Sequence, residues 1–161
     1  MKRAKFPARG SIVTRRLVEA VPAAPAENED AAAFARRRAQ CEALEDVEID
    51  IMLASDQVMT EIRHGYTIWQ AQEQRRLGEL ERQGAAPPSI SMEGLEAIKA
   101  LHEQCVRRLV VCVRGLDFGE VASERMDVER LIACLRDERL LADVATVARD
   151  AQSPTPTQLE R

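Results

Sequence analysis

The chain has 161 residues, of which 45% are apolar but only 3% aromatic, and its net charge is −4 at neutral pH. Its length suits about one domain, and a core limited to Leu, Val, Ile, Met, Cys and Ala is typical of packed helices rather than of a β-sandwich. The acidic balance argues against a nucleic-acid binder that uses the whole chain, and the lack of any run of about 20 apolar residues predicts no membrane span.

The first 27 residues are basic, with six lysines or arginines and two glutamates. Lys2, Arg3, Lys5 and Arg9 form an arm that is predicted to contact an anionic partner, and any nucleic-acid binding would be weak and limited to this arm. Residues 11–18 are rich in β-branched side chains but would form a strand only by pairing with another segment. We therefore expect a flexible arm and a Pro/Ala linker. The arm lacks the apolar segment of a signal peptide, which predicts a cytoplasmic protein.

Three proline pairs divide the rest of the chain, namely Pro22 and Pro25, Pro87 and Pro88, and Pro154 and Pro156. Proline interrupts helices because it lacks a backbone donor and clashes with the preceding turn. The intervening segments predict an all-α helical domain over residues 28–151, followed by a polar tail over residues 152–161. In the expected architecture a long, possibly kinked helix packs on a second long helix and on two short C-terminal helices.

The first helical segment covers residues 28–83, with Asn28 or Asp30 as its N-cap. Its apolar side chains recur at helical spacing, at Phe34, Cys41, Leu44, Ile51, Val58, Ile62 and Trp69. Such a length exceeds that of an ordinary globular helix. We expect either one rod or a break at residues 44–50 or 64–66, and two helices or a kinked one are favoured.

The second segment predicts a helix over residues 91–114, capped by Ser89 or Ser91 and ended by Gly115. Its apolar positions again follow one helix face, and they are Leu95, Ile98, Leu101, Cys105, Leu109, Cys112 and Val113. Two short helices are expected to follow, capped by Asp127 and Asp137.

Catalytic and metal-binding motifs are scarce. Glu61 and His64 form the Glu-x-x-His spacing of di-iron bundles, but a second such pair is missing. Cys41, Cys105, Cys112 and Cys134 form no Cys-x-x-Cys pair and are expected to be reduced and buried. The sequence therefore predicts no enzyme, no cofactor and no metal site.

The last 45 residues resemble a known family. A turn at residues 115–118 is followed by the short helix from Asp127 to Leu135, the run Leu140-Leu141-Ala142-Asp143-Val144, and the polar tail of residues 153–160. This order is similar to that of the tail assembly chaperones of long-tailed phages and prophages, and the β-branched opening of residues 10–17 also fits. The resemblance implies a small, mostly helical cytoplasmic protein that coats a tape-measure protein and recruits tail-tube subunits, without catalytic residues.

Two functions from different classes follow. The first is a non-enzymatic tail assembly chaperone or assembly factor that binds a helical partner, such as a tape-measure segment, or a tail-tube subunit, in an apolar groove. The predicted groove residues are Ile51, Val58, Ile62, Trp69, Leu109 and Val113. The alternative is a structural subunit that self-associates as a coiled coil through residues 34–69, where Glu48 and Ser55 interrupt the apolar seam.

Overall fold

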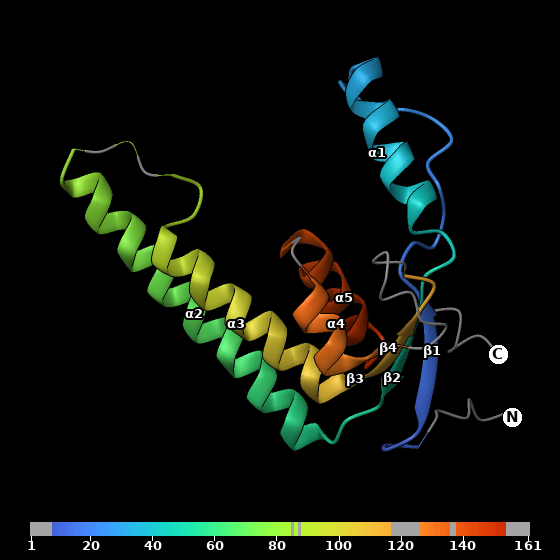
Figure 1. The fold of residues 1–161 in the computed structure, drawn as a ribbon. Helices are drawn as coiled ribbons and strands as arrows, with labels where there is room; N and C mark the ends of the chain where they lie inside the picture. The colour runs from blue at the N-terminus through green and yellow to red at the C-terminus, as the bar shows by residue number, and fades with distance from the viewer. Residues whose placement is uncertain (1–7, 85, 87, 117–125, 136–137, 154–161) are drawn as a thin grey trace, which may run out of the picture.

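The computed structural model describes residues 8–84, 86, 88–116, 126–135 and 138–153 (Figure 1). The described chain contains both helices and short strands. The elements are β1 (Ile12–Arg16), α1 (Ala31–Ala43), β2 (Glu48–Met52), α2 (Asp56–Arg82), α3 (Met92–Leu109), β3 (Val110–Arg114), β4 (Met126–Asp127), α4 (Val128–Cys134) and α5 (Glu138–Asp150). The predicted all-α fold class is therefore wrong, because the protein is a mixed α/β structure.

The strands form one antiparallel sheet in the order β1-β2-β3-β4. Strand β2 alternates in the manner of a sheet with one covered face. Ile49 and Ile51 are fully buried, whereas Glu48 and Asp50 point to the opposite side and are partly exposed. Residues 48–52 were predicted to be helical because Ile51 fits the spacing of a helix face as well as that of a strand, but the period of two in this segment is that of a strand.

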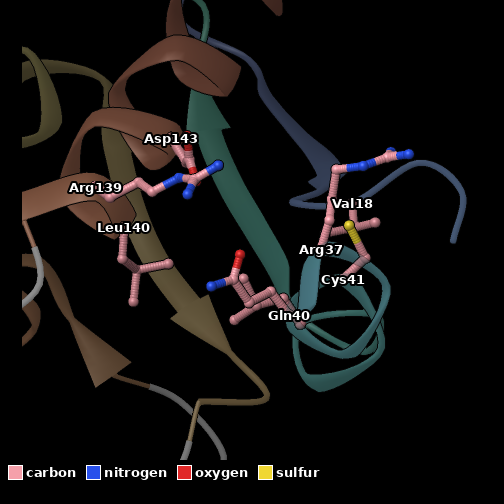
Figure 2. A pocket seen from close by; sticks show the side chains of 8 residues that line it. Val18, Arg37, Gln40, Cys41, Arg139, Leu140 and Asp143 are labelled. Atoms are coloured by element: carbon pink, nitrogen blue, oxygen red, sulfur yellow. The ribbon is translucent and has the colours of Figure 1, made fainter. Parts of the chain in front are cut away.

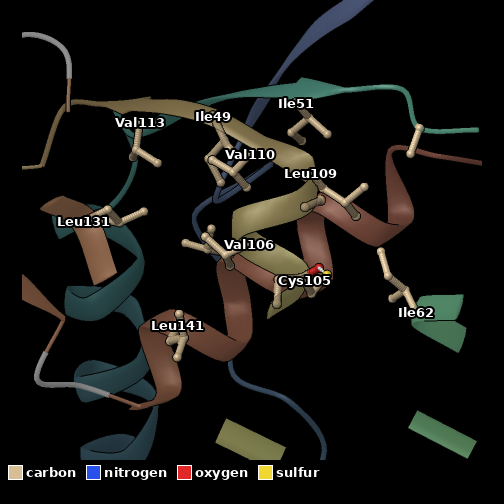
Figure 3. Packing of buried hydrophobic residues seen from close by; sticks show 14 of the residues in the cluster. Ile49, Ile51, Ile62, Cys105, Val106, Leu109, Val110, Val113, Leu131 and Leu141 are labelled. Atoms are coloured by element: carbon tan, nitrogen blue, oxygen red, sulfur yellow. Dashed lines mark hydrogen bonds between the residues drawn. The ribbon is translucent and has the colours of Figure 1, made fainter. Parts of the chain in front are cut away.

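Helices α3, α4 and α5 contact the strands at the buried face of the sheet, whereas α1 stands apart from it (Figure 1). Helices α2 and α3 form a long antiparallel hairpin, and α5 packs against α3 and β2. The core lies between this layer and the sheet (Figure 3). Its fully buried members include Val47, Ile49, Ile51, Val106, Leu109, Val113, Leu131 and Val144.

The second predicted helix ends five residues early. Helix α3 stops at Leu109 and the chain continues directly as β3, with Val110 already extended at φ −90° and ψ 129°. The run from Val110 to Val113 contains three valines, whose branched side chains favour a strand, and its backbone pairs with β2. Cys112 and Val113 therefore belong to the sheet rather than to the helix.

The predicted helical segment of residues 28–83 is interrupted at residues 44–50, the first of its two predicted break points. Residues 44–50 separate α1 from α2 and include most of β2, whereas α2 runs without interruption through residues 64–66. Part of the predicted flexible arm, residues 12–16, is β1 and pairs with β2. The N-caps Asp30, Ser91 and Asp127 are confirmed, because each side chain accepts a hydrogen bond from the backbone three residues ahead.

The folded part extends through Gln152, which the sequence assigned to the tail. This side chain is 6% exposed. Its amide nitrogen donates to the carbonyls of Met52 and Ala148 at 3.0 and 3.3 Å, and its oxygen accepts from the Ala54 amide at 2.9 Å. The end of α5 is thereby tied to the link between β2 and α2. Within the described residues, no helix is long and apolar enough to cross a membrane.

Candidate functional site

Helix α1 differs from the other long helices in that none of its residues is buried. An isolated helix of 13 residues has marginal stability in water, because helix nucleation costs free energy and so short a helix forms few hydrogen bonds to offset it. The bonds that hold it are local. Asp30 caps it, Arg37 donates to both oxygens of Glu29 at 2.9 and 3.0 Å, and Arg38 pairs with Glu42 at 2.9 Å. Helix α1 thus lacks the apolar packing that stabilises most protein helices.

The inner side of α1 faces α5 across an open groove (Figure 2). The groove has a volume of about 210 Å³, and it is lined by Val18, Arg37, Gln40, Cys41, Leu44, Arg139, Leu140 and Asp143. Pockets for small molecules usually enclose ~300–1,000 Å³. The groove therefore has room for a few side chains of a protein partner and too little for a typical cofactor.

The arginine on the α1 side of the groove is fixed in place. This residue is Arg37, whose hydrogen bonds to Glu29 lower the pKa of the Glu29 carboxyl below its usual value. The same hydrogen bonds raise the pKa of Arg37. The Arg37 guanidinium also lies 5.7 Å from the centre of the Phe34 ring. Arg37 is thus a positioned cation beside half-buried apolar side chains, a combination that suits a partner with an apolar anchor and a polar rim.

Most of the sequence-predicted partner residues lie in the core. Ile51, Leu109 and Val113 are 0% exposed, and Ile62 is 8% exposed. Their outer sides are covered by the sheet, by α3 and by α5, so a partner helix would have to displace one of these elements. Trp69 is half-buried in the α2–α3 hairpin, where its indole nitrogen donates to the Gly94 carbonyl at 2.8 Å.

Val58, another predicted partner residue, lines a cavity. That cavity measures about 510 Å³ and is bounded by Arg9, Gly10, Met52, Leu53, Ala54, Ser55, Val58 and Arg108. Arg9, from the predicted anion-contacting arm, lies there 3.4 Å from Asp56. The other arm residues, Lys2, Arg3 and Lys5, lie outside the described residues. Both arginines at this cavity already pair with carboxylates, since Arg108 binds Glu61 at 2.8 Å.

The Glu61 and His64 pair is placed apart from other potential ligands. Glu61 is engaged by Arg108, which lowers the pKa of its carboxyl, and His64 is exposed. In the part of the chain that the structure describes, no three His, Cys, Asp or Glu side chains come together in a way that could hold a metal ion.

A polar network crosses the sheet on the side away from the helices. The Asp50 carboxylate accepts from the Thr14 hydroxyl at 2.7 Å, from the Arg114 guanidinium at 2.5 Å and from the Cys112 thiol at 3.1 Å. Arg114 also binds Glu48 at 3.0 Å. The Arg114 hydrogen bond is the main reason that the pKa of Asp50 lies well below its usual range. The network joins β1, β2 and β3 and therefore has a structural role.

The cysteines are all free thiols, of which Cys105 and Cys112 are buried and Cys41 and Cys134 are half-buried. Cys105 belongs to a cluster that the sequence did not predict, together with Tyr66, His102 and Arg149. The Tyr66 hydroxyl lies 2.8 Å from Nδ1 of His102, and the Arg149 guanidinium lies 4.1 Å from the centre of the Tyr66 ring. Burial raises the pKa of the Cys105 thiol to about 11, so this thiol is protonated and a poor nucleophile at neutral pH.

The same cluster predicts a pH dependence of stability. Burial, and secondarily the nearby charge of Arg149, lowers the pKa of His102 below its ordinary 6.5. A lowered histidine pKa means that protonation disfavours the folded state. The contribution of neutral His102 is therefore complete above pH 6.5 and is lost as the pH falls below that value. We expect the unfolding free energy in urea to decrease between pH 7.5 and 5.5.

His102→Gln should remove this component of the pH dependence, whereas His64→Gln should retain it because His64 is exposed. These are the two histidines of the chain. An identical pH slope in His102→Gln and in the parent protein would show that the cluster does not sense protonation.

The sequence did not predict the α1–α5 groove or the cluster of Tyr66, His102, Cys105 and Arg149. Tyr66, His102 and Arg149 come from α2, α3 and α5, and the groove residues come from the two ends of the chain. Comparisons of the chain with protein-family models, curated proteins and solved structures found no significant match.

Proposed function

We propose that this protein is a non-enzymatic binding protein that holds a helical segment of a protein partner in the groove between α1 and α5. The observation that supports this most is the state of α1, a 13-residue helix with no buried residue that faces an apolar groove. A partner helix seated there would bury the inner side of α1 and supply the packing that this helix lacks.

The groove replaces the sequence-predicted binding site and keeps the predicted class of partner. Ile51, Ile62, Leu109 and Val113 are already used by the core, and residues 34–69 are divided among α1, β2 and α2 instead of forming one coiled-coil helix. The high pKa of the Cys105 thiol, about 11, also favours a role without nucleophilic catalysis.

The more specific identity of a cytoplasmic tail assembly chaperone stays a hypothesis. Much of the segment that carries this resemblance, residues 117–125 and 154–161, lies outside the described residues. A tape-measure segment or a tail-tube subunit would be a partner of the proposed class, and a second copy of the chain is the alternative occupant.

Position-specific crosslinking in the source cells tests the proposal. A photo-crosslinking amino acid would replace Gln40, which lines the groove, or Ala35, which is exposed on the opposite side of α1. We expect a defined partner adduct from position 40 and none from position 35. Equal adducts from both positions, or none from either, would contradict a partner in the groove.

A matched pair of charge variants supplies the control. Cys41→Glu places a longer, charged side chain in the groove, where a partner would have to desolvate it, and Ala39→Glu places the same charge on the exposed side of the same helix. Cys41→Glu should abolish the adduct from position 40 and Ala39→Glu should leave it unchanged. Since α1 has no buried residue, neither variant should lower the thermal stability of the core.

A further inference from the structure

Strand β1 lies at the end of the sheet order, so one of its edges has no neighbouring strand among the described residues (Figure 1). Its other edge pairs with β2 through odd-numbered residues, as shown by the bonds from Leu17 N to Val47 O at 3.0 Å and from Leu53 N to Ser11 O at 2.9 Å. Backbone groups alternate in direction along a strand. The amides and carbonyls of Ile12, Thr14 and Arg16 therefore point to the free edge.

The side chains along this edge are basic and apolar. Strand β1 contains Arg15 and Arg16, and residues 8–18 contain no acidic residue, in a protein whose net charge is −4. Ile12 is 56% exposed at the other end of the strand. Arg15 occupies part of the edge, because its guanidinium donates to the Thr14 carbonyl at 3.1 Å, and such a bond is easily exchanged for a backbone donor.

The strand already shows which side chains complement it. On its paired edge, Glu48 lies opposite Arg16 in the register, although its carboxylate binds Arg114 at 3.0 Å. Asp50 lies opposite Thr14 and accepts a hydrogen bond from its hydroxyl at 2.7 Å. Met52 lies opposite Ile12, and both are exposed apolar side chains. Opposite charges and apolar pairs across an antiparallel ladder are each stabilising.

We infer that the free edge of β1 binds an extended acidic segment of another protein, which adds antiparallel to β1 as a fifth strand. The segment would carry a carboxylate opposite Arg16 and an aliphatic side chain opposite Ile12, in the alternating order seen in β2. Its backbone pairs with the amides and carbonyls of Ile12, Thr14 and Arg16 at the free edge and displaces the Arg15 guanidinium from the Thr14 carbonyl, as in other cases of strand addition. This surface is separate from the α1–α5 groove, and its test does not depend on that proposal.

A synthetic peptide that copies residues 46–53, with blocked termini, is the probe. A second peptide with lysine in place of both Glu48 and Asp50 has the same length and apolar residues and serves as the control. We expect the acidic peptide to slow amide hydrogen exchange at Ile12, Thr14 and Arg16, and to bind at least about tenfold more tightly than the lysine peptide at low salt. No slowing at these three amides would overturn the proposal.

Two variants of Thr14 separate the backbone edge from the side-chain network. Thr14→Val and Thr14→Pro both remove the hydroxyl that binds Asp50, but only proline removes the amide at the free edge while leaving the β1–β2 bonds in place. We expect Thr14→Val to bind the acidic peptide like the parent protein and Thr14→Pro to bind about tenfold more weakly or worse. Equal binding by both variants would contradict strand addition.

Arg16→Glu keeps the test decisive if the proline variant fails to fold, because Arg16 is exposed and has no hydrogen bond or ion pair among the described residues. This variant should lose its preference for the acidic peptide and bind the lysine peptide more tightly. An unchanged preference would contradict the charge pairing. A concentration-dependent dimer that Thr14→Pro converts to monomer would also overturn the proposal, because the occupant would then be a second copy of β1.

Discussion

Replacing Leu109 with alanine is expected to lower the unfolding free energy by about 3 kcal/mol, within the range of roughly 2–5 kcal/mol typical of buried leucines. Leu109 is 0% exposed and lies at the junction of α3 and β3, where its side chain contributes to the core (Figure 3). The loss combines the transfer free energy of the removed isopropyl group with the cost of the cavity that it leaves. Urea unfolding followed by circular dichroism measures the change.

Met92→Ala is the matched control for this experiment. Met92 begins the same helix but is 75% exposed, so its truncation should change the unfolding free energy by less than about 0.5 kcal/mol. The comparison also separates the two interpretations of Leu109. A residue of an open binding groove would behave like Met92 and lose only partner binding, and such a result would remove Leu109 from the core.

Gly94→Ala is expected to cost about 2 kcal/mol, although alanine normally stabilises a helix relative to glycine. A Cβ at position 94 would collide with the carboxylate of Glu73. This carboxylate belongs to a side chain that is buried, and it accepts from the Ser91 amide at 2.6 Å and from the Ser91 hydroxyl at 2.9 Å. These bonds join α2 to the N-terminus of α3, and the added methyl group forces the carboxylate away from them.

Gly78→Ala provides the opposite expectation in the same hairpin. Position 78 is inside α2, and a Cβ added there would have no described atom within 4 Å beyond its own helix turn, so alanine should stabilise the protein by about 0.4–1 kcal/mol. Glu73→Ala should relieve the clash, and the double variant Gly94→Ala with Glu73→Ala should cost less than the sum of the single changes. Additive costs, or stabilisation by Gly94→Ala alone, would show that the Glu73 contact does not restrain the hairpin.

Local features of the fold were predictable because local chemistry decides them. Asp30, Ser91 and Asp127 cap helices where short polar side chains precede apolar periodic segments. The turn after α2 coincides with Gly84, whose φ is +81°, and with the proline pair that follows it. The hairpin of two long helices was therefore visible in the order of caps, apolar positions and prolines.

The sheet was missed because short buried strands and helix segments share the same apolar spacing. Leu109, Cys112 and Val113 lie at i, i+3 and i+4, which fits a helix face, yet Val110 to Val113 form a strand that pairs with β2. The signals that favour the strands are the three valines in β3 and the alternation of Ile49 and Ile51 with acidic residues in β2. Each strand also depends on its neighbours for its hydrogen bonds. Pairing between segments far apart in the chain cannot be recognised from the local sequence pattern of either segment.

The candidate site was less predictable than the fold. Amphipathic periodicity identified apolar faces correctly but could not tell which face the chain itself covers, and Ile51 and Val113 proved to be core residues. The groove depends on where α5 places Leu140 relative to Cys41 of α1, and this relation is set by tertiary packing. One sequence feature does indicate that α1 is poorly packed. Its composition is rich in alanine and arginine and therefore offers little apolar surface to bury.

Amide hydrogen exchange along the whole chain tests most directly the claim that a sheet-and-helix core carries an unpacked α1 that a partner completes. In the free protein we expect the slowest exchange in β2, β3 and α3, and near-unprotected amides throughout α1. In the complex with the partner crosslinked at position 40, exchange in α1 should slow by at least about tenfold. Exchange in α1 of the free protein as slow as that in α3 would contradict the account, because α1 would then need no partner.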